Sequence, residues 1–371
     1  MTPQLQYQQD LQRSDFIHDK AQAYAVAQLQ QIFQQLTDNT QLEIESPSLF
    51  GKFKKRFVSP PKLNKPRVKG LYMWGGVGRG KTYLMDTFFN CLPVENKMRV
   101  HFHRFMQRIH QDLKQLAGHR DPLLAVAAGI RAEAEVICFD EFFVSDITDA
   151  MLLGTLFEAL FAQGVTLIAT SNIPPEELYR NGLQRQRFLP TITLIQEHCQ
   201  VINVDGGHDY RMRTLTEAEI YHYPLGEAAE QNLAHYFMQL SNEPRQHLGE
   251  IEINQRMIGF VNEADSVIHL EFAELCEGAR SQLDYIELAK LYHTVLLSGV
   301  VSMNAKNDDA ARRFIALVDE FYERHVALII SAEVEMSKLY QGGRLSFEFE
   351  RCLSRLQEMQ SHEYLEREHL P

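Results

Sequence analysis

The clearest chemical signal in this sequence is a glycine-rich segment that begins at residue 75. It consists of Gly75, Gly76, Val77, Gly78, Arg79, Gly80, Lys81 and Thr82, which match the pattern G-x-x-x-x-G-K-[ST]. Backbone N–H groups of such a loop wrap a polyphosphate, and glycine permits the close approach and positive φ that this requires. Lys81 is expected to reach the β- and γ-phosphates, and Thr82 to offer its hydroxyl to Mg²⁺. The segment therefore predicts a site for a nucleoside triphosphate, ATP, together with Mg²⁺.

Acidic and amide side chains follow two apolar runs further along the chain. Asp140 and Glu141 come directly after VICF, and Asn172 comes shortly after VTLIAT. Because ligands bind at the carboxyl ends of strands in open α/β sheets, these residues are expected to face the phosphates. Asp140 is predicted to hold Mg²⁺ through water, and Glu141 to polarise the attacking water as general base. Asn172 is predicted to position the same water, and a helix cap before Pro174 is its alternative role.

Two pairs of arginines are candidates for contacting the phosphates. Arg185 and Arg187 lie where a ring-forming ATPase would donate an arginine to a neighbouring subunit, a contribution of several orders of magnitude in rate. Spacing alone does not choose between them, and a solvated surface position is the alternative for either. Arg312 and Arg313, at the start of a predicted helix, are candidates for a second arginine that senses the phosphates in cis. An ordinary helix surface is the alternative for that pair.

Strands and helices alternate in the pattern that must position these residues. Strands are predicted at 71–74, 99–103, 136–140 and 165–170, and helices at 80–90, 104–116, 122–134 and 146–162, with a further helix opened by Pro174 and Pro175. Such alternation indicates a parallel sheet covered by helices on both faces. The predicted fold class is therefore α/β, of the P-loop nucleoside triphosphatase type.

The segments on either side of this core differ from it in pattern. A helix capped near Ser14 and a linker rich in Lys, Arg and Pro at 50–70 are predicted before the core. After Asp205, helices are predicted at 214–241, 281–297, 308–326 and 346–366, a β-hairpin insertion at 251–272 and a strand at 326–332. No internal repeat of solenoid period is found. The predicted domains are an N-terminal helical segment with a basic linker (1–69), an ATPase core (70–210), and a C-terminal lid-like region with the β insertion and a terminal helix (211–371).

Composition and charge restrict the classes of partner. The 371 residues include 37 Lys and Arg against 49 Asp and Glu, and the net charge of −12 disfavours general binding of nucleic acid or anionic lipid. The five cysteines are widely separated, as expected in a reducing compartment. The sequence has no apolar run suited to a membrane span or to secretion, so a cytoplasmic location without integral membrane contact is predicted.

Longer segments around these motifs resemble a known family. They are GLYMWGGVGRGKTYLMD, HFHRFM, CFDEFFVSDITDAMLL, TSNIPPEELYRNGLQRQRFLP and, far downstream, FEFERCLSRLQEMQS, which together are similar to the AFG-one-like AAA+ ATPases. The resemblance runs from about residue 70 to the end of the chain. It implies an AAA+ fold, dependence on ATP and Mg²⁺, and self-association into a ring such as a hexamer.

The resemblance also implies a partner and roles for particular residues. It implies association with FtsZ at the division ring, where ATP use would loosen FtsZ polymers, while mitochondrial relatives are linked to protein quality control. The family pattern GLQR-x-x-F-x-P-x-I favours Arg185 over Arg187 as the arginine donated to a neighbour. The β-rich segment 251–272 departs from a plain helical AAA+ lid, the element on which the assignment of Arg313 depends.

Three classes of function are compatible with these residues. The first is an oligomeric ATPase that remodels a protein, and it is favoured because Glu141, Asn172 and Arg185 follow the phosphate loop in that order. The second is a nucleic-acid motor or a loader for one, which shares the ATP core but is disfavoured by the acidic net charge. The third is a nucleotide switch or small-molecule kinase, which works as a monomer without the Asp-Glu pair and the downstream arginine.

Overall fold

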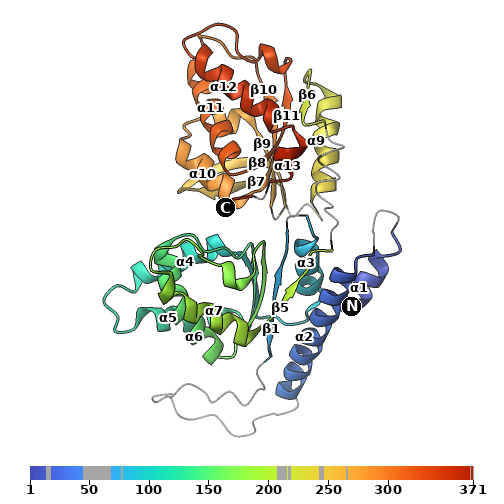
Figure 1. The fold of residues 1–371 in the computed structure, drawn as a ribbon, viewed down its shortest axis with the longest axis vertical. Coiled ribbons are helices and arrows are strands. Elements are labelled where there is room, and N and C mark those ends of the chain that lie inside the picture. The colour runs from blue at the N-terminus through green and yellow to red at the C-terminus, as the bar shows by residue number, and fades with distance from the viewer. Residues whose placement is uncertain are drawn as a thin grey trace. The chain divides into compact units, whose positions relative to one another are not determined.

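The chain is represented by a computed structural model with two compact units, residues 1–208 and residues 209–371 (Figure 1). The structure describes residues 1–13, 18–44, 68–76, 78–206, 215, 219–241, 246–264, 266–367 and 369–370. Each unit has a sheet and a hydrophobic core of its own. No helix within the described residues is long and apolar enough to cross a lipid bilayer.

The first unit is built on a five-stranded sheet in which every neighbouring pair of strands is parallel. Its strands are β1 (Gly70–Trp74), β2 (Lys97–His101), β3 (Val136–Asp140), β4 (Thr166–Ser171) and β5 (Cys199–Asn203), in the spatial order β2-β3-β4-β1-β5. The predicted α/β class with a parallel sheet is therefore confirmed. Strand β4 lies between β3 and β1, so the carboxyl ends of these three strands are neighbours.

Helices cover both faces of this sheet (Figure 1). They are α3 (Lys81–Cys91), α4 (Phe102–Gln115), α5 (Pro122–Glu133), α6 (Ile147–Ala162) and α7 (Leu189–His198), joined by α1 (Pro3–Asp10) and α2 (Lys20–Ile44) from the N-terminus. Alternate strand residues point to opposite faces. Ile137 and Phe139 thus join the core with α4 to α7, while Val136 and Cys138 join the core with α1 to α3. Burial of both faces explains why these strands read as continuous apolar runs.

Two element boundaries in the first unit differ from the predictions. The strand expected to reach His103 ends at His101, because Phe102 is already the first residue of α4. The helix expected from Pro174 and Pro175 is a single 3-10 turn, η1 (Pro175–Glu177). In both places the change from one element to the next occurs within a run whose composition suits either, so composition alone does not locate the boundary.

The N-terminal helix begins later than predicted, and a short helix precedes it. The carboxylate of Asp19 accepts hydrogen bonds from the backbone N–H groups of Ala21 (2.7 Å) and Gln22 (3.3 Å), and thereby caps α2. Ser14, the predicted cap, lies outside the described residues, as does most of the predicted basic linker. The preceding helix α1 is polar on most of its surface and gave no periodic signal.

The second unit contains a six-stranded mixed sheet in the order β6-β11-β10-β9-β8-β7. Its strands are β6 (Tyr221–His222), β7 (Gln246–Ile253), β8 (Arg256–Ala264), β9 (Val267–Glu271), β10 (Thr294–Val300) and β11 (Ala327–Ala332). Its helices are α9 (Glu227–Leu240), α10 (Gln282–Leu291), α11 (Asp308–Glu323), α12 (Ser346–Glu358) and α13 (His362–Leu365), with the π-helix η3 (Ala273–Glu277) and the 3-10 turn η4 (Met336–Lys338). Strands β6, β11, β10 and β9 pair in parallel, whereas β8 is antiparallel to both of its neighbours, β9 and β7.

Strands replace parts of two predicted helices in the second unit. The segment 214–241 contains β6 before α9, and the helix predicted over 281–297 ends at Leu291 and is followed by β10. The hairpin insertion predicted at 251–272 consists instead of three strands, β7 to β9, of the larger sheet. Strand β10 reads TVLLSGV and is largely buried, and an apolar run of this kind cannot be told from a buried helix by periodicity. The last predicted helix is divided into α12 and α13 at 359–361.

A buried histidine is expected to make the stability of the second unit depend on pH. His269 on β9 is 8% exposed, neither of its ring nitrogens has a hydrogen-bond partner among the described residues, and burial lowers its pKa from 6.5 to about 4. The unfolded chain therefore takes up this proton at a higher pH than the folded chain. The contribution of neutral His269 to the free energy of unfolding should be fully present above pH 6.5. The free energy of unfolding should then decrease by about 3 kcal/mol as the pH falls towards 4.

Urea unfolding of the parent and of a His269→Leu variant between pH 7 and pH 4 measures this effect. The variant has no ionisable group at this position, so its free energy of unfolding should vary less steeply with pH than that of the parent. Equal slopes for the two proteins would contradict the prediction.

Candidate nucleotide-binding site

The predicted site residues lie at the carboxyl ends of three neighbouring strands of the first unit. Gly75 follows β1, Asp140 ends β3 and is followed by Glu141, and Asn172 follows β4. Because β4 lies between β1 and β3, the fold brings to one edge of the sheet groups that are far apart in the sequence. Ligands of parallel α/β sheets bind at this edge, which is therefore the candidate nucleotide site.

The loop between β1 and α3 has a backbone conformation that glycine adopts readily. Gly78 and Gly80 have φ angles of 73° and 79°, and Gly80 is the N-cap residue of α3. A Cβ atom at Gly80 would also lie 2.5 Å from the side-chain nitrogen Nε2 of Gln22. Val77, which is also part of this loop, lies outside the described residues. The amino end of α3 therefore opens directly from a tight loop, which is the geometry of a phosphate site.

Lys81 and Thr82 are the first two residues of α3. The Lys81 ammonium donates hydrogen bonds to the carbonyl oxygens of Gly75 (2.5 Å) and Gly76 (2.7 Å), so the side chain lies back over the loop. The arrangement places a positive charge beside the positive end of a helix dipole, which suits a polyanion. Thr82 is half-buried in the same turn.

Two residues that the sequence analysis did not single out hold the loop in place. The amide nitrogen Nε2 of Gln22, buried on α2, donates a hydrogen bond to the carbonyl oxygen of Arg79 (3.1 Å). The carboxylate of Asp205 forms an ion pair with Nε of Arg79 (3.0 Å). Both partners are distant from Arg79 in the sequence, so no local pattern could have identified them.

A buried arginine accompanies the predicted metal ligand. Asp140 is 5% exposed, and its two carboxylate oxygens accept hydrogen bonds from Arg99 Nε (2.7 Å) and Arg99 Nη2 (3.2 Å). Arg99, on β2, also forms an ion pair with Asp86 on α3. The guanidinium thus compensates the buried carboxylate and connects it to the helix that follows the phosphate loop. Arg99 was not among the predicted site residues, although a cation within a strand of an α/β core is a signal that could have identified it.

Removing Arg99 is expected to destabilise the first unit strongly. An Arg99→Met variant would leave Asp140 buried without its cation, which costs about 3–5 kcal/mol in the free energy of unfolding. Urea unfolding measures the difference. Arg108→Met is a matched control, because Arg108 pairs with Glu133 at the exposed surface, where a pair contributes about 0–1 kcal/mol. Equal losses in the two variants would contradict the role assigned to Arg99.

Glu141 has an unusual backbone conformation for a residue with a side chain. Its φ angle is 52°, its N–H donates to the hydroxyl oxygen of Thr170 (3.2 Å), and the next N–H, of Phe142, donates to the carbonyl oxygen of Thr170 (2.7 Å). A left-handed conformation at a residue other than glycine costs of order 1 kcal/mol and is concentrated at functional sites. The strained turn directs the chain sharply away from β3 just after the acidic pair.

Asn172 stands at the next strand end, half-buried and directly after Ser171. The hydroxyl of Ser171 donates a hydrogen bond to the carbonyl oxygen of Phe142 (2.8 Å), so the loops that follow β3 and β4 are tied together. The alternative role of Asn172 as a helix cap is wrong, because the 3-10 turn η1 has Pro174 as its N-cap and lacks a side-chain cap bond. Its position beside the acidic pair leaves the water-orienting role as a prediction.

The candidate arginines have contacts of their own. Arg185, in the 3-10 turn η2 (Arg185–Arg187), is half-buried, and its Nη2 donates to the carbonyl oxygen of Glu176 (2.5 Å). Arg187 is exposed and donates only within its own turn, to the side-chain oxygen of Gln184 (3.1 Å). Their roles stay predictions.

The other pair of arginines lies in the second unit, on α11. Arg313 donates a hydrogen bond from Nη1 to the carbonyl oxygen of Cys276 (3.0 Å), which ties α11 to the turn η3 of the same unit. Arg312 is exposed. The assignment of a phosphate-sensing role to Arg313 stays a prediction.

Two buried ionisable groups near the strand ends, the Cys138 thiol and the Tyr72 hydroxyl, stay protonated, and the donor set suits Mg²⁺. Burial and the carboxylate of Asp140 raise the pKa of the Cys138 thiol, and burial raises the pKa of the Tyr72 hydroxyl. Within the described part of the chain, no three His, Cys, Asp or Glu side chains form a metal cluster. Mg²⁺ commonly takes only one or two protein ligands and completes its shell with phosphate oxygens and water, which fits a hydroxyl on Thr82 and a carboxylate on Asp140.

Comparisons with known proteins show the family of the chain. A family model described as AFG1-like ATPase matches residues 1–368. Cell division protein ZapE of Escherichia coli (strain K12) is 52% identical over 370 residues, which cover 100% of this chain and 99% of that protein. Lactation elevated protein 1 homolog B of Danio rerio is 34% identical over 346 residues, 80% of this chain and 68% of that protein. The similarity therefore begins at residue 1, earlier than the motifs indicated.

Among solved structures, AMPPCP-bound DnaA from Aquifex aeolicus is similar to this chain with a TM-score of 0.34 and 14% identity, over 61% of each chain. The structure of PCH-2 from C. elegans is similar with a TM-score of 0.31 and 14% identity, over 95% of this chain and 72% of that chain.

Proposed function

Because the chain belongs to the AFG1-like ATPase family, we propose that it hydrolyses ATP with Mg²⁺ to remodel a protein partner, FtsZ polymers at the division ring. The identity of 52% over the whole chain to a cell division protein supports the cellular role. The observation that supports the catalytic part is that the loop leading from β1 to Lys81 and the acidic pair that follows β3 lie at the same edge of the sheet, on either side of β4.

Each residue at this edge has a distinct task in the proposed reaction. The loop N–H groups and Lys81 bind and orient the triphosphate at the amino end of α3. Thr82 and Asp140 would hold Mg²⁺, which when bound supplies positive charge to the phosphates. Glu141 accepts a proton from the attacking water, and Asn172 orients that water.

Arg185 would complete the site of a neighbouring subunit. In this structure its guanidinium is bound to a backbone carbonyl of its own chain, that of Glu176. Docking of a neighbour would exchange this neutral acceptor for a phosphate, a stronger partner for a guanidinium. Self-association into a ring such as a hexamer would then make hydrolysis depend on assembly, because a single chain lacks the arginine that completes its site.

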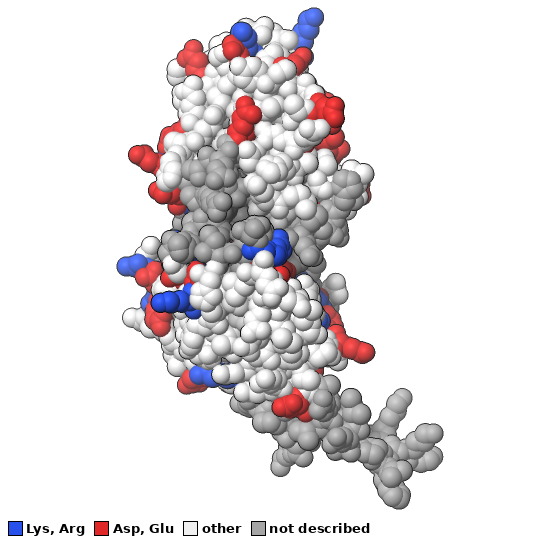
Figure 2. Space-filling model, turned by 90° about the vertical axis from the view of Figure 1, so that its right-hand side faces the viewer, with Lys and Arg blue, Asp and Glu red and all other residues white. Residues whose placement is uncertain are grey.

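The distribution of charge favours a protein over a nucleic acid as the partner. The net charge is −12. On the face shown in Figure 2, Lys and Arg side chains of the described residues stand apart or in small groups between acidic ones. A groove that binds nucleic acid generally presents a continuous basic stripe. A nucleic-acid loader and a quality-control ATPase are the alternatives that the experiment must separate from FtsZ remodelling.

A Glu141→Gln variant tests the proposal. It should bind ATP but hydrolyse it about 10²–10⁴-fold more slowly, because the general base is lost while the phosphate contacts are kept. With ATP, the variant should co-sediment with polymers of purified FtsZ, and the parent protein should disperse them. A Lys81→Ala variant, deprived of nucleotide, should do neither.

The outcomes separate the parts of the proposal. The FtsZ role would be contradicted if the Glu141→Gln variant did not bind FtsZ polymers and the parent did not disperse them. Phosphate release by the parent would still support the ATPase. Tight and steeply salt-dependent binding of a DNA oligonucleotide would favour the loader instead.

A further inference from the structure

The second unit repeats the central topology of the first. The spatial order β1-β4-β3-β2 of the first sheet and the order β6-β11-β10-β9 of the second are both entirely parallel. The chain order corresponds as well, since β1, β2, β3 and β4 are matched by β6, β9, β10 and β11. Helices α6 and α11, which connect the third and fourth of these strands, each have 16 residues. Helices α3 and α9, which follow the first strand of each set, correspond in the same way.

A pattern of three residues recurs after the fourth strand of each unit. Tyr179, Gly182 and Phe188 follow β4, and Tyr340, Gly343 and Phe349 follow β11, so that positions 179 and 340, 182 and 343, and 188 and 349 each differ by 161. In both sets the tyrosine and phenylalanine rings are in contact, with centroids 5.6 Å and 4.9 Å apart. In both sets a Cβ atom on the glycine would collide with the tyrosine ring or hydroxyl. The corresponding rings are therefore in contact in both units, edge to face in the first (70°) and stacked in the second (18°).

A tyrosine hydrogen bond recurs at the first strand of each set. In the first unit the hydroxyl of Tyr72 on β1 donates to the carbonyl oxygen of Ile173 (3.0 Å). In the second unit the hydroxyl of Tyr221 on β6 donates to the carbonyl oxygen of Val334 (2.8 Å). Tyr72 is paired with the residue of β4 that corresponds to the β11 partner of Tyr221, so the strand register agrees with the hydrogen bond.

A left-handed backbone conformation also recurs at the carboxyl end of the third strand, where Glu141 follows β3 and Gly299 lies near the end of β10. Glu141 in the first unit and Gly299 in the second have φ angles of 52° and 73°. The Glu141 N–H donates to the hydroxyl of Thr170 (3.2 Å), and the Gly299 N–H donates to the hydroxyl of Ser331 (3.2 Å). Positions 170 and 331 again differ by 161. Three independent local structures thus place the two units in one residue-by-residue correspondence.

The residues of the predicted chemistry are replaced at the corresponding positions. The connection from β1 to α3 has six residues, 75–80, whereas that from β6 to α9 has four, 223–226. Helix α9 begins with Glu227, whereas α3 begins with Lys81. At the end of the third strand, Ser298 and Gly299 occupy the positions of Asp140 and Glu141. After the fourth strand, Glu333 occupies the position of Asn172. Two carboxylates have thus replaced an ammonium and an amide, a change that repels a polyphosphate. The carboxylate of Glu333 accepts a hydrogen bond from the backbone N–H of Ser302 (2.9 Å), within its own unit.

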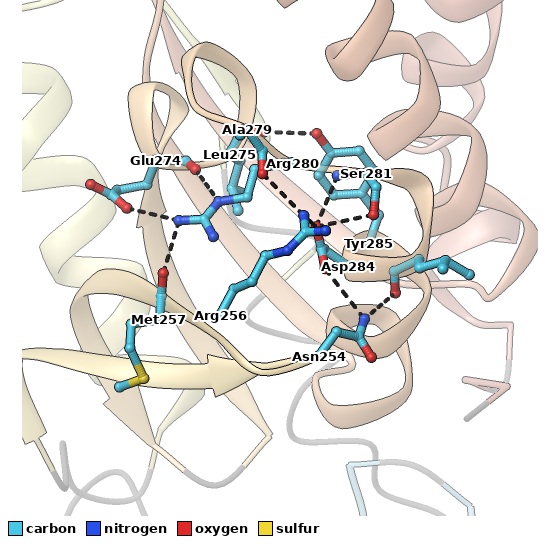
Figure 3. Close-up of polar contacts among 11 residues, drawn as sticks. Asn254, Arg256, Met257, Glu274, Leu275, Ala279, Arg280, Ser281, Asp284 and Tyr285 are labelled. Atoms are coloured by element: carbon cyan, nitrogen blue, oxygen red, sulfur yellow. Dashed lines mark hydrogen bonds and ion pairs between the residues drawn. The ribbon is translucent and has the colours of Figure 1, made fainter.

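The second unit also carries an addition, the β7–β8 hairpin. Helix α3 and strand β2 are joined by five residues, 92–96, whereas the hairpin separates α9 from β9. Side chains near its tip fix it to the unit (Figure 3): Arg256 donates to the buried carboxylate of Asp284 (3.0 Å), and Asn254 donates to the carbonyl oxygen of Leu283 (3.0 Å). The hairpin therefore extends the sheet as a fixed part of the fold.

We propose that the second unit is a degenerate copy of the nucleotide-binding core whose phosphate site has been lost, and that each chain holds one nucleotide, in the first unit. The contacts that recur between the units stabilise the fold. The residues that differ are those assigned, in the first unit, to binding the phosphates, Mg²⁺ and the attacking water. The second unit accordingly has a role other than hydrolysis. This inference rests on the proposed ATP site of the first unit and assigns to the second unit the same fold without a nucleotide site.

Nucleotide stoichiometry in the full chain tests the inference. Isothermal titration of the parent with a non-hydrolysable ATP analogue and Mg²⁺ should give one site per chain, and a Lys81→Ala variant should show none. A Glu333→Gln variant is the matched control in the second unit and should bind one nucleotide with the affinity of the parent. Hydrogen exchange with the same analogue should slow at 71–82, 136–142 and 166–173.

Exchange at the corresponding segments of the second unit, 221–232, 294–300 and 327–334, should not respond to nucleotide in the Lys81→Ala variant. Two nucleotides per parent chain, or protection of these segments that persists in that variant, would overturn the degenerate copy and leave the proposed ATPase intact. A parent chain that binds no nucleotide would instead contradict the proposed ATPase.

Discussion

Replacing Lys81 with alanine is expected to abolish ATP binding at micromolar nucleotide and to slow turnover by about 10²–10³-fold or more, as loss of a preorganised donor does at a site of developing charge. Lys81 lies over the loop on the carbonyl oxygens of Gly75 and Gly76. The other cation of the loop, Arg79, is held by Asp205 (3.0 Å) and does not substitute for it. The remaining N–H groups carry only partial charges.

Fluorescent-nucleotide titration and phosphate release measure the two effects separately. Lys114→Ala is a suitable control, because Lys114 is an exposed lysine in the last turn of α4 and its removal changes the net charge by the same amount. The unfolding free energy of the Lys81→Ala variant should remain close to that of the parent. A Lys81→Ala protein that splits ATP as fast as the parent would remove the proposed site.

Replacing Arg185 with alanine is expected to preserve ATP binding and to reduce turnover by about 10³–10⁵-fold, the range found when an arginine that stabilises transition-state charge is lost. The guanidinium is bound to the Glu176 carbonyl of its own chain, and because the proposal assigns it to the site of a neighbouring subunit, its loss should leave nucleotide binding intact. Arg187→Ala is the matched control, since Arg187 is exposed two positions away in the same turn. Its turnover should match that of the parent.

Mixing two inactive variants tests whether Arg185 acts on a neighbouring subunit. A Lys81→Ala chain keeps its arginine, and an Arg185→Ala chain keeps its phosphate loop, so an assembly of both contains some complete sites. Phosphate release should therefore reappear on mixing. Mixtures that stay inactive although the chains co-assemble, or an Arg185→Ala protein with normal turnover, would exclude donation between subunits.

Most of the first unit could be predicted from its sequence. The phosphate loop is a contiguous pattern whose spacing follows from the backbone itself, and VICFD and VTLIAT are short apolar runs bounded by polar residues. These signals are local, so they identified β3, β4 and the start of α3 without any knowledge of packing. The errors in this unit lie at element ends, as at Phe102, where the residue after a strand already belongs to a helix.

The second unit was harder to predict because its strands carry no chemical pattern. Strand β10 is an apolar run covered on both faces, and periodicity alone assigned it to a helix. Its correspondence with β3 rests on strand order, on register and on hydrogen bonds such as that of Tyr221, which match those of the first unit. The residues of the phosphate site differ between the units, and the repeat is retained in the arrangement of the fold and in a few identities such as Tyr340, Gly343 and Phe349.

The sequence by itself determined the phosphate loop, the acidic pair, the apolar strands and the α/β class, because each depends on residues close together in the chain. Only the tertiary structure decided that β4 lies between β1 and β3, and that Arg99 compensates Asp140. It alone also decided that Gln22 and Asp205 hold Arg79. These contacts join segments that are distant in the sequence, and their partners are selected by burial and charge compensation in the folded core.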